Sequence, residues 1–422
     1  MSDTDNRPRF PAYRPRPADA PLALAGIRVV DFSRVLAGPW ATQYLADMGA
    51  DVIKVEEPSG DMSRGGNGLI QDGISGFFLC TNRNKRSIAL DLATSEGQAV
   101  ALDLITQADV VVENYTSRVM KGFGLDYASL AARFPRLVYC SISAYGRDGS
   151  LADAPGYDPI VAAESGLVAL NAADGEAPFV CSLPIVDLTA AMNGAIAILG
   201  ALMARERLGK GQFVETAMFD GALANLSYKG AEYLALGNTP FTIGRRTSLA
   251  PGGEFPTGNG SIWFAAPAEK VARAMICEVL DRPDLYADPR FSTVKARLEN
   301  RRALEEEIVR CLAADDAENW AAKMKAARVP CGVIRTVAQA YHSPPATERE
   351  LVREVEHPVI GRYADVASPI RMSLTPVVDP VAAPGLGAHR LQVLREDLGY
   401  DEGRILSLEK AGAFGRVEEA TA

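Results

Sequence analysis

One acidic residue, Asp187, stands in the otherwise uncharged stretch SLPIVDLTAAMNG, where a long apolar helix is expected to begin. A carboxylate at that place has two uses. It can cap the helix by accepting hydrogen bonds from the free N–H groups, and the helix dipole favours its charge. It can also act as a nucleophile on a substrate. The local spacing leaves both interpretations open and favours the helix cap.

Two further candidates, Tyr157 and Asp158, follow the predicted strand RLVYCSISAYG and its glycine-containing loop. If that strand belongs to a parallel sheet, both residues can line the same crevice as Asp187. Taken alone, they are typical of a turn and a helix cap. All three histidines come after residue 340, away from the predicted sheet loops, so nucleophiles activated by histidine are not expected.

A cluster of hydrogen-bond donors, TNRNKRSI, precedes another predicted strand. Charge-assisted hydrogen bonds to phosphate are strong, so this cluster is a candidate site for a phosphorylated ligand. A solvated basic turn is an equally good interpretation. The donors in question are Asn82, Arg83, Lys85 and Arg86.

Two loops at predicted strand ends could hold a ligand. FSRVLAGPW has one glycine and lacks GxGxxG, so a dinucleotide cofactor is not supported. A helix start there can still hold a phosphate or an adenine edge, although a plain strand-to-helix turn is the simpler interpretation. Asn114 and Tyr115 end the strand VVVENY, where an amide can grip a polar group and a ring can stack. Asparagine is also common wherever a strand turns.

Strands that alternate with helices predict an α/β fold with a mostly parallel, Rossmann-like sheet. The expected strands lie at 27–32, 51–57, 86–92, 109–115, 136–146 and 212–219, and a long helix covers about 188–208. We expect four parts along the chain: a flexible N-terminal arm (1–20), a large domain (21–225), a smaller α+β domain (226–334) and a C-terminal segment (335–422) that returns to the large domain.

Composition narrows the class of protein. A formal charge of −9 argues against binding to nucleic acid or to anionic membranes. Six scattered cysteines without a CxxC pair argue against zinc and disulfides and fit a reducing cytoplasm. The start of the chain has five prolines and four arginines but no apolar segment of a signal peptide, and we expect it to drape over a partner subunit. The long apolar helix is expected to be a buried core helix.

Together, these segments resemble the class III CoA-transferase family, which includes formyl-CoA transferase, carnitine CoA-transferase and the 2-methylacyl-CoA racemases. The resemblance runs from Leu24 to Gly399. Each motif is weak alone, but their ordered set is specific. The motifs are VVDFSRVLAGPWATQYLADMGADVIKVEEPSGDMSRG, NRNKRSIALDL, ADVVVENY, IVDLTAAMNGAIAILGAL, HPVIG…SPIRMSLTP and LGAHRLQVLREDLGY.

The resemblance implies that Asp187 is the nucleophile of a CoA transfer that forms acyl-aspartyl and aspartyl-CoA intermediates and needs no metal or permanently bound cofactor. A helix start would help to lower the pKa of this carboxyl group and keep it ionised. The family also implies an interlocked homodimer and a CoA molecule that lies along the loops of the large domain. The residues assigned to CoA in this way are Val35, Leu36, Arg64, Asn82, Arg83, Lys85, Arg86, Asn114, Tyr115 and Arg118.

Departures from the family pattern indicate the reaction. The racemases have a histidine where this chain has Tyr157, and a phenol is a poor base near neutral pH, so CoA transfer is favoured over racemisation. Formyl-CoA transferase has a glutamine where this chain has Leu36, and it has a longer glycine run where this chain has APGGEF. Oxalate and formate are therefore not expected as substrates. Gly252 and Gly253 are still expected to form a short loop that covers the intermediate.

The substrates remain open at this level. A dicarboxylic donor such as succinyl-CoA is plausible, and a second substrate carboxylate would need a cation. The candidates for that cation are Arg34, Arg118, Arg245 and Arg246. A racemase of the same fold and a non-catalytic CoA-binding protein, in which Asp187 is only a cap, are the alternatives.

Overall fold

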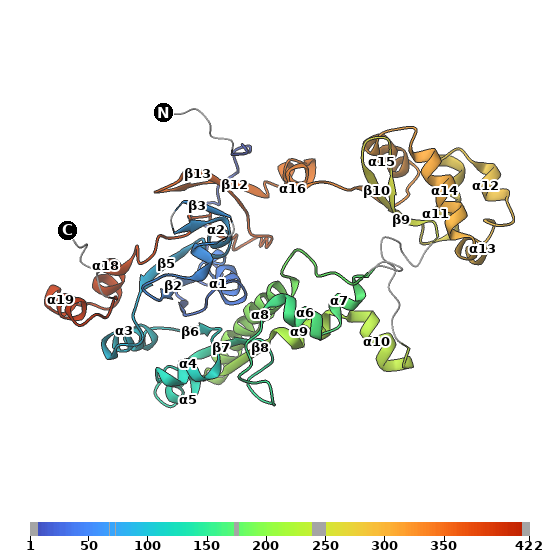
Figure 1. The fold of residues 1–422 in the computed structure, drawn as a ribbon. Coiled ribbons are helices and arrows are strands. Elements are labelled where there is room, and N and C mark those ends of the chain that lie inside the picture. The colour runs from blue at the N-terminus through green and yellow to red at the C-terminus, as the bar shows by residue number, and fades with distance from the viewer. Residues whose placement is uncertain (1–6, 67, 72, 173–176, 239–249, 416–422) are drawn as a thin grey trace. The chain divides into compact units, whose positions relative to one another are not determined.

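The computed structural model describes residues 7–66, 68–71, 73–172, 177–238 and 250–415, which form two compact units. Unit 1 comprises Met1–Leu167, Cys181–Ala231 and Tyr341–Ala422, and unit 2 comprises Val168–Val180 and Glu232–Ala340. The chain leaves unit 1 twice and returns each time. Figure 1 shows the elements of each unit along the chain.

Unit 1 is built on a six-stranded parallel sheet with the order β5-β2-β1-β6-β7-β8, which confirms the predicted α/β fold. Runs of valine and isoleucine form the strands because β-branched side chains suit a sheet that is buried on both faces. The order reverses between β1 and β6, so the carboxyl ends of these strands border a crevice. The strands are β1 (Arg28–Asp31), β2 (Asp51–Glu56), β5 (Lys85–Ala89), β6 (Val110–Glu113), β7 (Val138–Ser143) and β8 (Phe213–Ala217).

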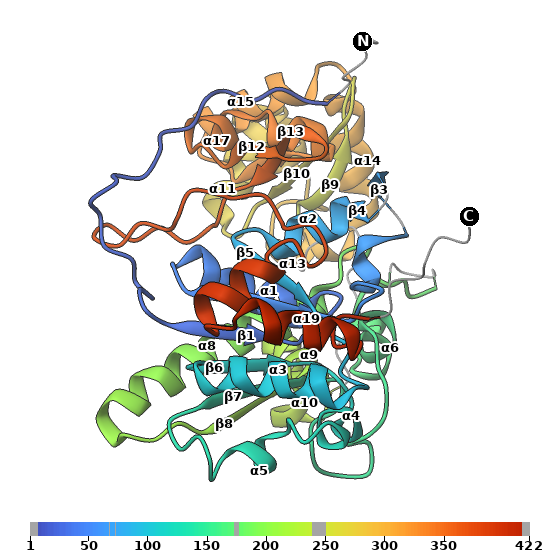
Figure 2. The same cartoon turned by 90° about the vertical axis from the view of Figure 1, so that its left-hand side faces the viewer.

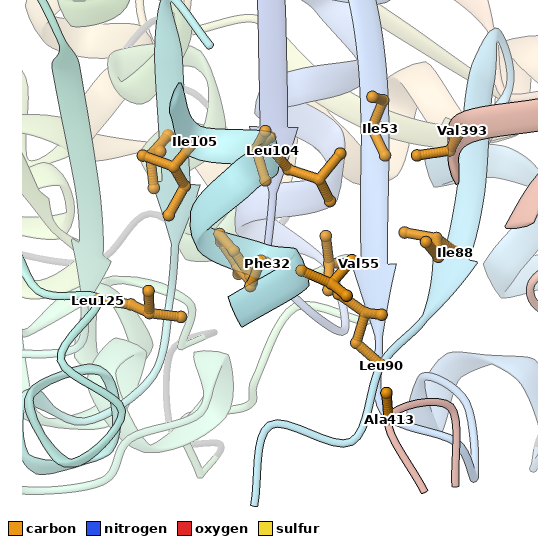
Figure 3. Close-up of a cluster of buried hydrophobic side chains, with 14 of the residues drawn as sticks. Phe32, Ile53, Val55, Ile88, Leu90, Leu104, Ile105, Leu125, Val393 and Ala413 are labelled. Carbon is orange, nitrogen blue, oxygen red and sulfur yellow. The ribbon is translucent and has the colours of Figure 1, made fainter. Parts of the chain in front are cut away.

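Helices cover both faces of this sheet. Helix α3 and the C-terminal helices pack on one face, where Phe32, Ile53 and Ile88 are buried (Figures 2 and 3). Burial of each such side chain contributes about 1.5–3 kcal/mol. Helices α1 and α8 pack together on the opposite face. The helices of unit 1 are α1 (Ala37–Asp47), α2 (Gly76–Asn82), α3 (Ser95–Thr106), α4 (Ser117–Gly122), α5 (Tyr127–Leu130), α6 (Asp158–Glu164), α8 (Ile185–Leu208), α9 (Met218–Asn225), α17 (Pro344–Glu348), α18 (Arg390–Gln392) and α19 (Glu402–Lys410).

Helix α8 was expected to be a buried core helix, but only one of its sides is buried. Alanines and Ile198 pack toward the sheet, whereas Ile196 and Met203 are each 67% exposed. The helix ends where Gly209 adopts the left-handed conformation, with a φ of +71°. Its 24 residues and hydropathy of 1.8 would suffice to cross a membrane by length and composition, which core helices of soluble proteins also satisfy. Among the described residues, no other helix meets that test.

The N-terminal arm lies against the C-terminal segment of its own chain, rather than only against a partner as the sequence suggested. The Phe10 ring stacks on His342 with centroids 4.6 Å apart, and the Arg16 N–H donates to Asp379 over 3.2 Å. These contacts order residues that have no regular structure. The remaining small elements of unit 1 are η1 (Met62–Arg64), η3 (Val393–Asp397) and the hairpins β3 (Leu69–Gln71) with β4 (Ile74–Ser75) and β12 (Val352–His357) with β13 (Gly361–Val366).

Unit 2 has its own core around a three-stranded antiparallel sheet with the order β11-β10-β9. Phe255 and Phe264 stack across two of its strands, with ring centroids 4.7 Å apart. Helices α7 (Leu167–Leu170), α10 (Ser227–Leu236) and α16 (Val337–Tyr341) cross between the units along the chain. The other elements are β9 (Gly252–Pro256), β10 (Ser261–Ala265), α11 (Glu269–Arg273), η2 (Ala274–Val279), α12 (Pro283–Ala287), α13 (Val294–Glu299), α14 (Arg301–Leu312), α15 (Ala317–Ala326) and β11 (Cys331–Val333).

Candidate active site

A cavity of about 150 Å³ lies at the carboxyl edge of the parallel sheet in unit 1. The loops after β1, β6 and β7 line it, together with the first turn of α8. Two of these loops follow the strands at which the sheet order reverses, the usual place for a ligand in such folds. The structure therefore brings several predicted residues into one cavity. Its lining includes Arg34, Val35, Leu36, Asn114, Tyr115, Ser143, Arg147, Tyr157 and Asp187.

A buried ion pair supports the cavity wall after β1. Val35 has a φ of +68°, a strained conformation for a β-branched residue. Its N–H donates to both carboxylate oxygens of Asp61 over 3.2 Å, and Lys54 Nζ lies 2.9 Å from Asp61 Oδ2. Burial acts to raise the pKa of Asp61, but Lys54 and hydrogen bonds from Ser63 lower it to about 2. The pair thus stays charged and holds the strained loop.

Asn114 joins the loop after β6 to the loop after β1. Its Oδ1 accepts from the N–H of Arg34 over 2.9 Å, and its Nδ2 donates to the carbonyl of the same residue over 2.8 Å. The sequence suggested that this amide grips a ligand; instead, both of its polar atoms engage the protein's own backbone. The Arg34 guanidinium lies over the Tyr115 ring, 4.7 Å from its centroid.

The start of α8 is capped by Asp158 and not by Asp187. Asp158 Oδ2 accepts from the N–H of Val186 over 2.7 Å and from the N–H of Asp187 over 3.0 Å. Asp158 is the first residue of α6 and is buried. In the described part of the chain, no group donates a hydrogen bond to the carboxylate of Asp187, which lines the cavity. The helix cap and the acid that lines the cavity are therefore two separate residues.

The pKa of the Asp187 carboxyl is raised to about 7. Burial is the larger cause, and the neighbouring charge of Asp158 adds to it. The prediction that the helix start lowers this pKa is wrong, because Asp158 takes the helix N–H groups and places a like charge beside Asp187. At pH 7 about half of the molecules carry an ionised Asp187.

Comparison with known proteins gives the family. The sequence model of CoA-transferase family III matches residues 24–390. The chain belongs to CoA-transferase family III. This membership confirms the resemblance that the ordered motifs indicated. As a CoA-transferase, the enzyme uses CoA as a substrate or an intermediate carrier.

Relatives of this CoA-transferase cover almost its whole length. It is 32% identical to the succinyl-CoA:glutarate CoA-transferase of Mus musculus, over 95% of this chain and 92% of that protein. It is 35% identical to the succinyl-CoA:mesaconate CoA-transferase of Haloarcula hispanica, over 89% and 96%. A CaiB/BaiF family protein from Brucella suis has a similar crystal structure, with a TM-score of 0.82, 32% identity and coverage of 89% and 99%.

Arg64 of this CoA-transferase does not line the cavity. Its Nε and Nη2 atoms each lie 2.7 Å from a carboxylate oxygen of Glu56, and its guanidinium stacks 3.6 Å from the Phe78 ring centroid. The side chain is buried. The predicted contact of Arg64 with the CoA phosphates is therefore not supported, since the Arg64 charge already compensates the buried Glu56.

The basic cluster at residues 82–86 likewise serves the fold. Each cation faces an acid from a neighbouring strand or segment, and none lines the cavity. Because the end of α2 and the start of β5 place these donors beside acids of the same chain, the predicted phosphate site is corrected to a set of internal ion pairs. The pairs are Arg83 with Asp47 (2.6 Å) and Asp365 (3.2 Å), Lys85 with Asp31 (3.0 Å), and Arg86 with Asp51 (2.7 Å) and Asp397 (2.6 Å), while Asn82 Oδ1 accepts from Lys85 over 2.9 Å.

Other predicted residues lie elsewhere. Arg118 is exposed, pairs with Asp153 over 3.2 Å and does not line the cavity. Gly252 and Gly253 do not form a loop; they begin strand β9, because their backbones pair with β10. Arg245 and Arg246 lie outside the described residues.

Tyr157 lines the cavity as the residue before α6, and its side chain is 59% exposed. Sequence reasoning missed Arg147, which also lines the cavity. Its Nη2 lies 2.9 Å from Glu113 Oε1 and 2.8 Å from the carbonyl of Tyr115. Arg147 follows the strand β7, so the argument that singled out Asn114 after β6 would have found it.

Proposed function

We propose that this enzyme transfers CoA from a dicarboxylic acyl-CoA such as succinyl-CoA to a second dicarboxylic acid, with Asp187 as the covalent nucleophile. One observation carries the assignment: the Asp187 carboxylate lines the cavity without a hydrogen-bonding partner in the described structure, while Asp158 caps the helix. The two relatives named above, which act on succinyl-CoA and on glutarate or mesaconate, support the choice of acids.

The transfer proceeds by four exchanges at carbonyl carbons. An Asp187 oxygen attacks the thioester carbon, the C–S bond breaks, and CoA leaves as a thiolate, so that an acyl-aspartyl anhydride remains. The thiolate then attacks the Asp187 carbonyl carbon, the donor acid leaves as its carboxylate, and an aspartyl-CoA thioester remains. The acceptor carboxylate attacks that carbon and expels the thiolate. The thiolate finally attacks the acceptor acyl carbon, which frees Asp187 and forms the new acyl-CoA.

The first exchange requires an ionised Asp187. Because the pKa of this group is raised to about 7, its carboxylate is more basic than an ordinary aspartate and is a better nucleophile when deprotonated. In this proposal CoA lies along the loops after β1 and β6, where Val35, Leu36 and Tyr115 line the cavity. Arg34 is not assigned to CoA and is available to bind the acyl group.

A homodimer, interlocked as the family resemblance implies, is the proposed assembly. The exposed apolar side of α8 supports a partner there, since Met192, Ile196 and Met203 lie along one side of the helix. The molar mass of the protein in solution, measured by sedimentation equilibrium, tests this assembly. Substitution of both Ile196→Lys and Met203→Lys is expected to shift the protein from dimer to monomer, and a monomeric parent protein would contradict the assembly.

Covalent trapping tests the reaction. The enzyme is incubated with succinyl-CoA and then hydroxylamine, and the modified peptide is mapped by mass spectrometry. We expect a hydroxamate on Asp187 in the parent, none in Asp187→Asn, and an unchanged result in Asp284→Asn, a matched change of an exposed acid in unit 2. Transfer at the parental rate by Asp187→Asn would overturn the mechanism. Incorporation of solvent deuterium at the α-carbon of the acyl-CoA, in the absence of an acceptor acid, would instead indicate a racemase.

A further inference from the structure

We propose that Arg34 binds the distal carboxylate of the dicarboxylic acyl group and thereby selects diacids over monocarboxylic acids. The inference rests on the proposed function, since it requires Asp187 to attack an acyl-CoA in this cavity. It assigns a specificity role to one of the four arginines that the sequence offered.

The placement of Arg34 favours this role. Arg34 and Asp187 line the same cavity of about 150 Å³. Because the carbonyl carbon under attack must contact the Asp187 carboxylate, the rest of a short acyl group must lie in that same space. Two hydrogen bonds with Asn114 hold the Arg34 backbone, and the Tyr115 ring supports its guanidinium at 4.7 Å. A fixed, half-buried cation is suited to recognise a carboxylate.

Arg34 differs from Arg147, the other arginine that lines the cavity, in whether a carboxylate compensates its charge. Arg147 lies 2.9 Å from Glu113 and also donates to the Tyr115 carbonyl and to Ser141. Arg34, by contrast, has no carboxylate within 4.0 Å among the described residues. Glu57 borders a small neighbouring cavity with Arg34 but forms no ion pair with it there. The cavity therefore contains one cation whose charge the described chain leaves uncompensated.

A dicarboxylic acyl group supplies the missing charge. A guanidinium can form two parallel hydrogen bonds to a carboxylate, which gives both strength and orientation. The carboxylates of Asp187 and Asp158 would repel a second acid in this region if no cation faced it. Among the other candidates, Arg118 is exposed, paired with Asp153 and outside the cavity. A CoA phosphate is the competing ligand for Arg34, and the test separates the two.

Two exchanges measured side by side provide the test. One transfers CoA from succinyl-CoA to glutarate, and the other from butyryl-CoA to pentanoate. We expect Arg34→Gln to lower kcat/KM of the dicarboxylate exchange by about 100-fold, the loss of a charged hydrogen-bonded contact, and to change the monocarboxylate exchange by less than about threefold. Arg34→Lys should recover part of the loss. Arg136→Gln, which changes an exposed arginine paired with Glu206, should match the parent.

The dissociation constant of CoA, measured by calorimetry, is the second readout. It should be unchanged in Arg34→Gln, and thermal unfolding should show that the variant is folded. A CoA dissociation constant that rises tenfold or more would assign Arg34 to a phosphate and overturn the inference. An unchanged dicarboxylate exchange would also overturn it. If the parent enzyme forms no adduct on Asp187 with succinyl-CoA, the proposed function itself fails.

Discussion

The carboxylate of Asp158 lies 3.0 Å from the backbone nitrogen of Asp187 and caps helix α8, whose first turn contains Asp187. This contact has two consequences. It removes the need for Asp187 to cap its own helix, and it places a negative charge beside the proposed nucleophile. We therefore propose that Asp158 positions Asp187 and does not itself react with the substrate, whereas the sequence suggested a catalytic role.

The pH dependence of transfer should report this pair. With a pKa of about 7 for Asp187, kcat/KM should fall about tenfold per pH unit well below pH 7 and level off above about pH 8. Asp158→Asn keeps an oxygen that can cap the helix but removes the charge, so the midpoint should move to lower pH. Rates measured from pH 5 to 9 check this. A midpoint that stays in place would show that the charge of Asp158 has no influence.

The effect of Asp187→Asn on stability should depend on pH. The folded-state pKa of about 7 exceeds the ordinary value of 3.8, so the folded protein holds an extra proton between these values. Stability from this group is present below about pH 4 and is lost as the pH rises to 7. Removing the charge should therefore raise the free energy of unfolding at pH 8 by at most about 4 kcal/mol, and Tm should rise with it. At pH 4 the same substitution should change Tm little.

Asp284→Asn is the matched control for that experiment. Its hydrogen bond to Arg282 lowers the pKa of this exposed acid, so the sign of any effect is opposite. Asp284→Asn should not raise Tm at pH 8. If Asp187→Asn lowers Tm at pH 8 instead, its carboxylate is stabilised in the folded state and the assigned burial cost is wrong.

The buried pair of Lys54 and Asp61 should be essential for both stability and the cavity wall. Asp61→Ala leaves the Lys54 charge buried without its main partner and Val35 without an acceptor, so we expect a loss of about 3–5 kcal/mol. The double change Lys54→Met with Asp61→Leu should recover much of the stability but not the transfer rate, because the Val35 N–H remains unbonded. Denaturant unfolding and steady-state rates distinguish the two effects.

Gly38 should not tolerate a side chain. A Cβ atom at this position would lie 2.2 Å from Ser33 Cβ and 2.3 Å from Ser33 Oγ, so the start of α1 or the loop after β1 would have to shift. We expect Gly38→Ala to cost about 1–3 kcal/mol and to lower the transfer rate, since that loop lines the cavity. Gly122→Ala, at a helical position with open space, should be tolerated. Equal behaviour of the two variants would contradict the close approach.

Much of the fold followed from local patterns. The valine-rich runs at β1, β2 and β6 and the glycine that ends α8 carry their signals within a few residues, and each lies within about two residues of the expected place. Gly252 and Gly253 show the limit. A glycine pair usually indicates a turn, but here the pairing of β9 with β10 overrides that preference.

The sequence by itself determined the parallel α/β sheet, the family and the position of Asp187 at a helix start, because all three depend on residues that are close in the chain or on an ordered set of motifs. Only the tertiary structure decided what the charged groups face. Arg83 meets Asp365 across 282 positions, and Asp158 reaches Asp187 across 29. The role of a charged group depends on its distance in space from the nearest opposite charge or free N–H, and local sequence does not determine that distance.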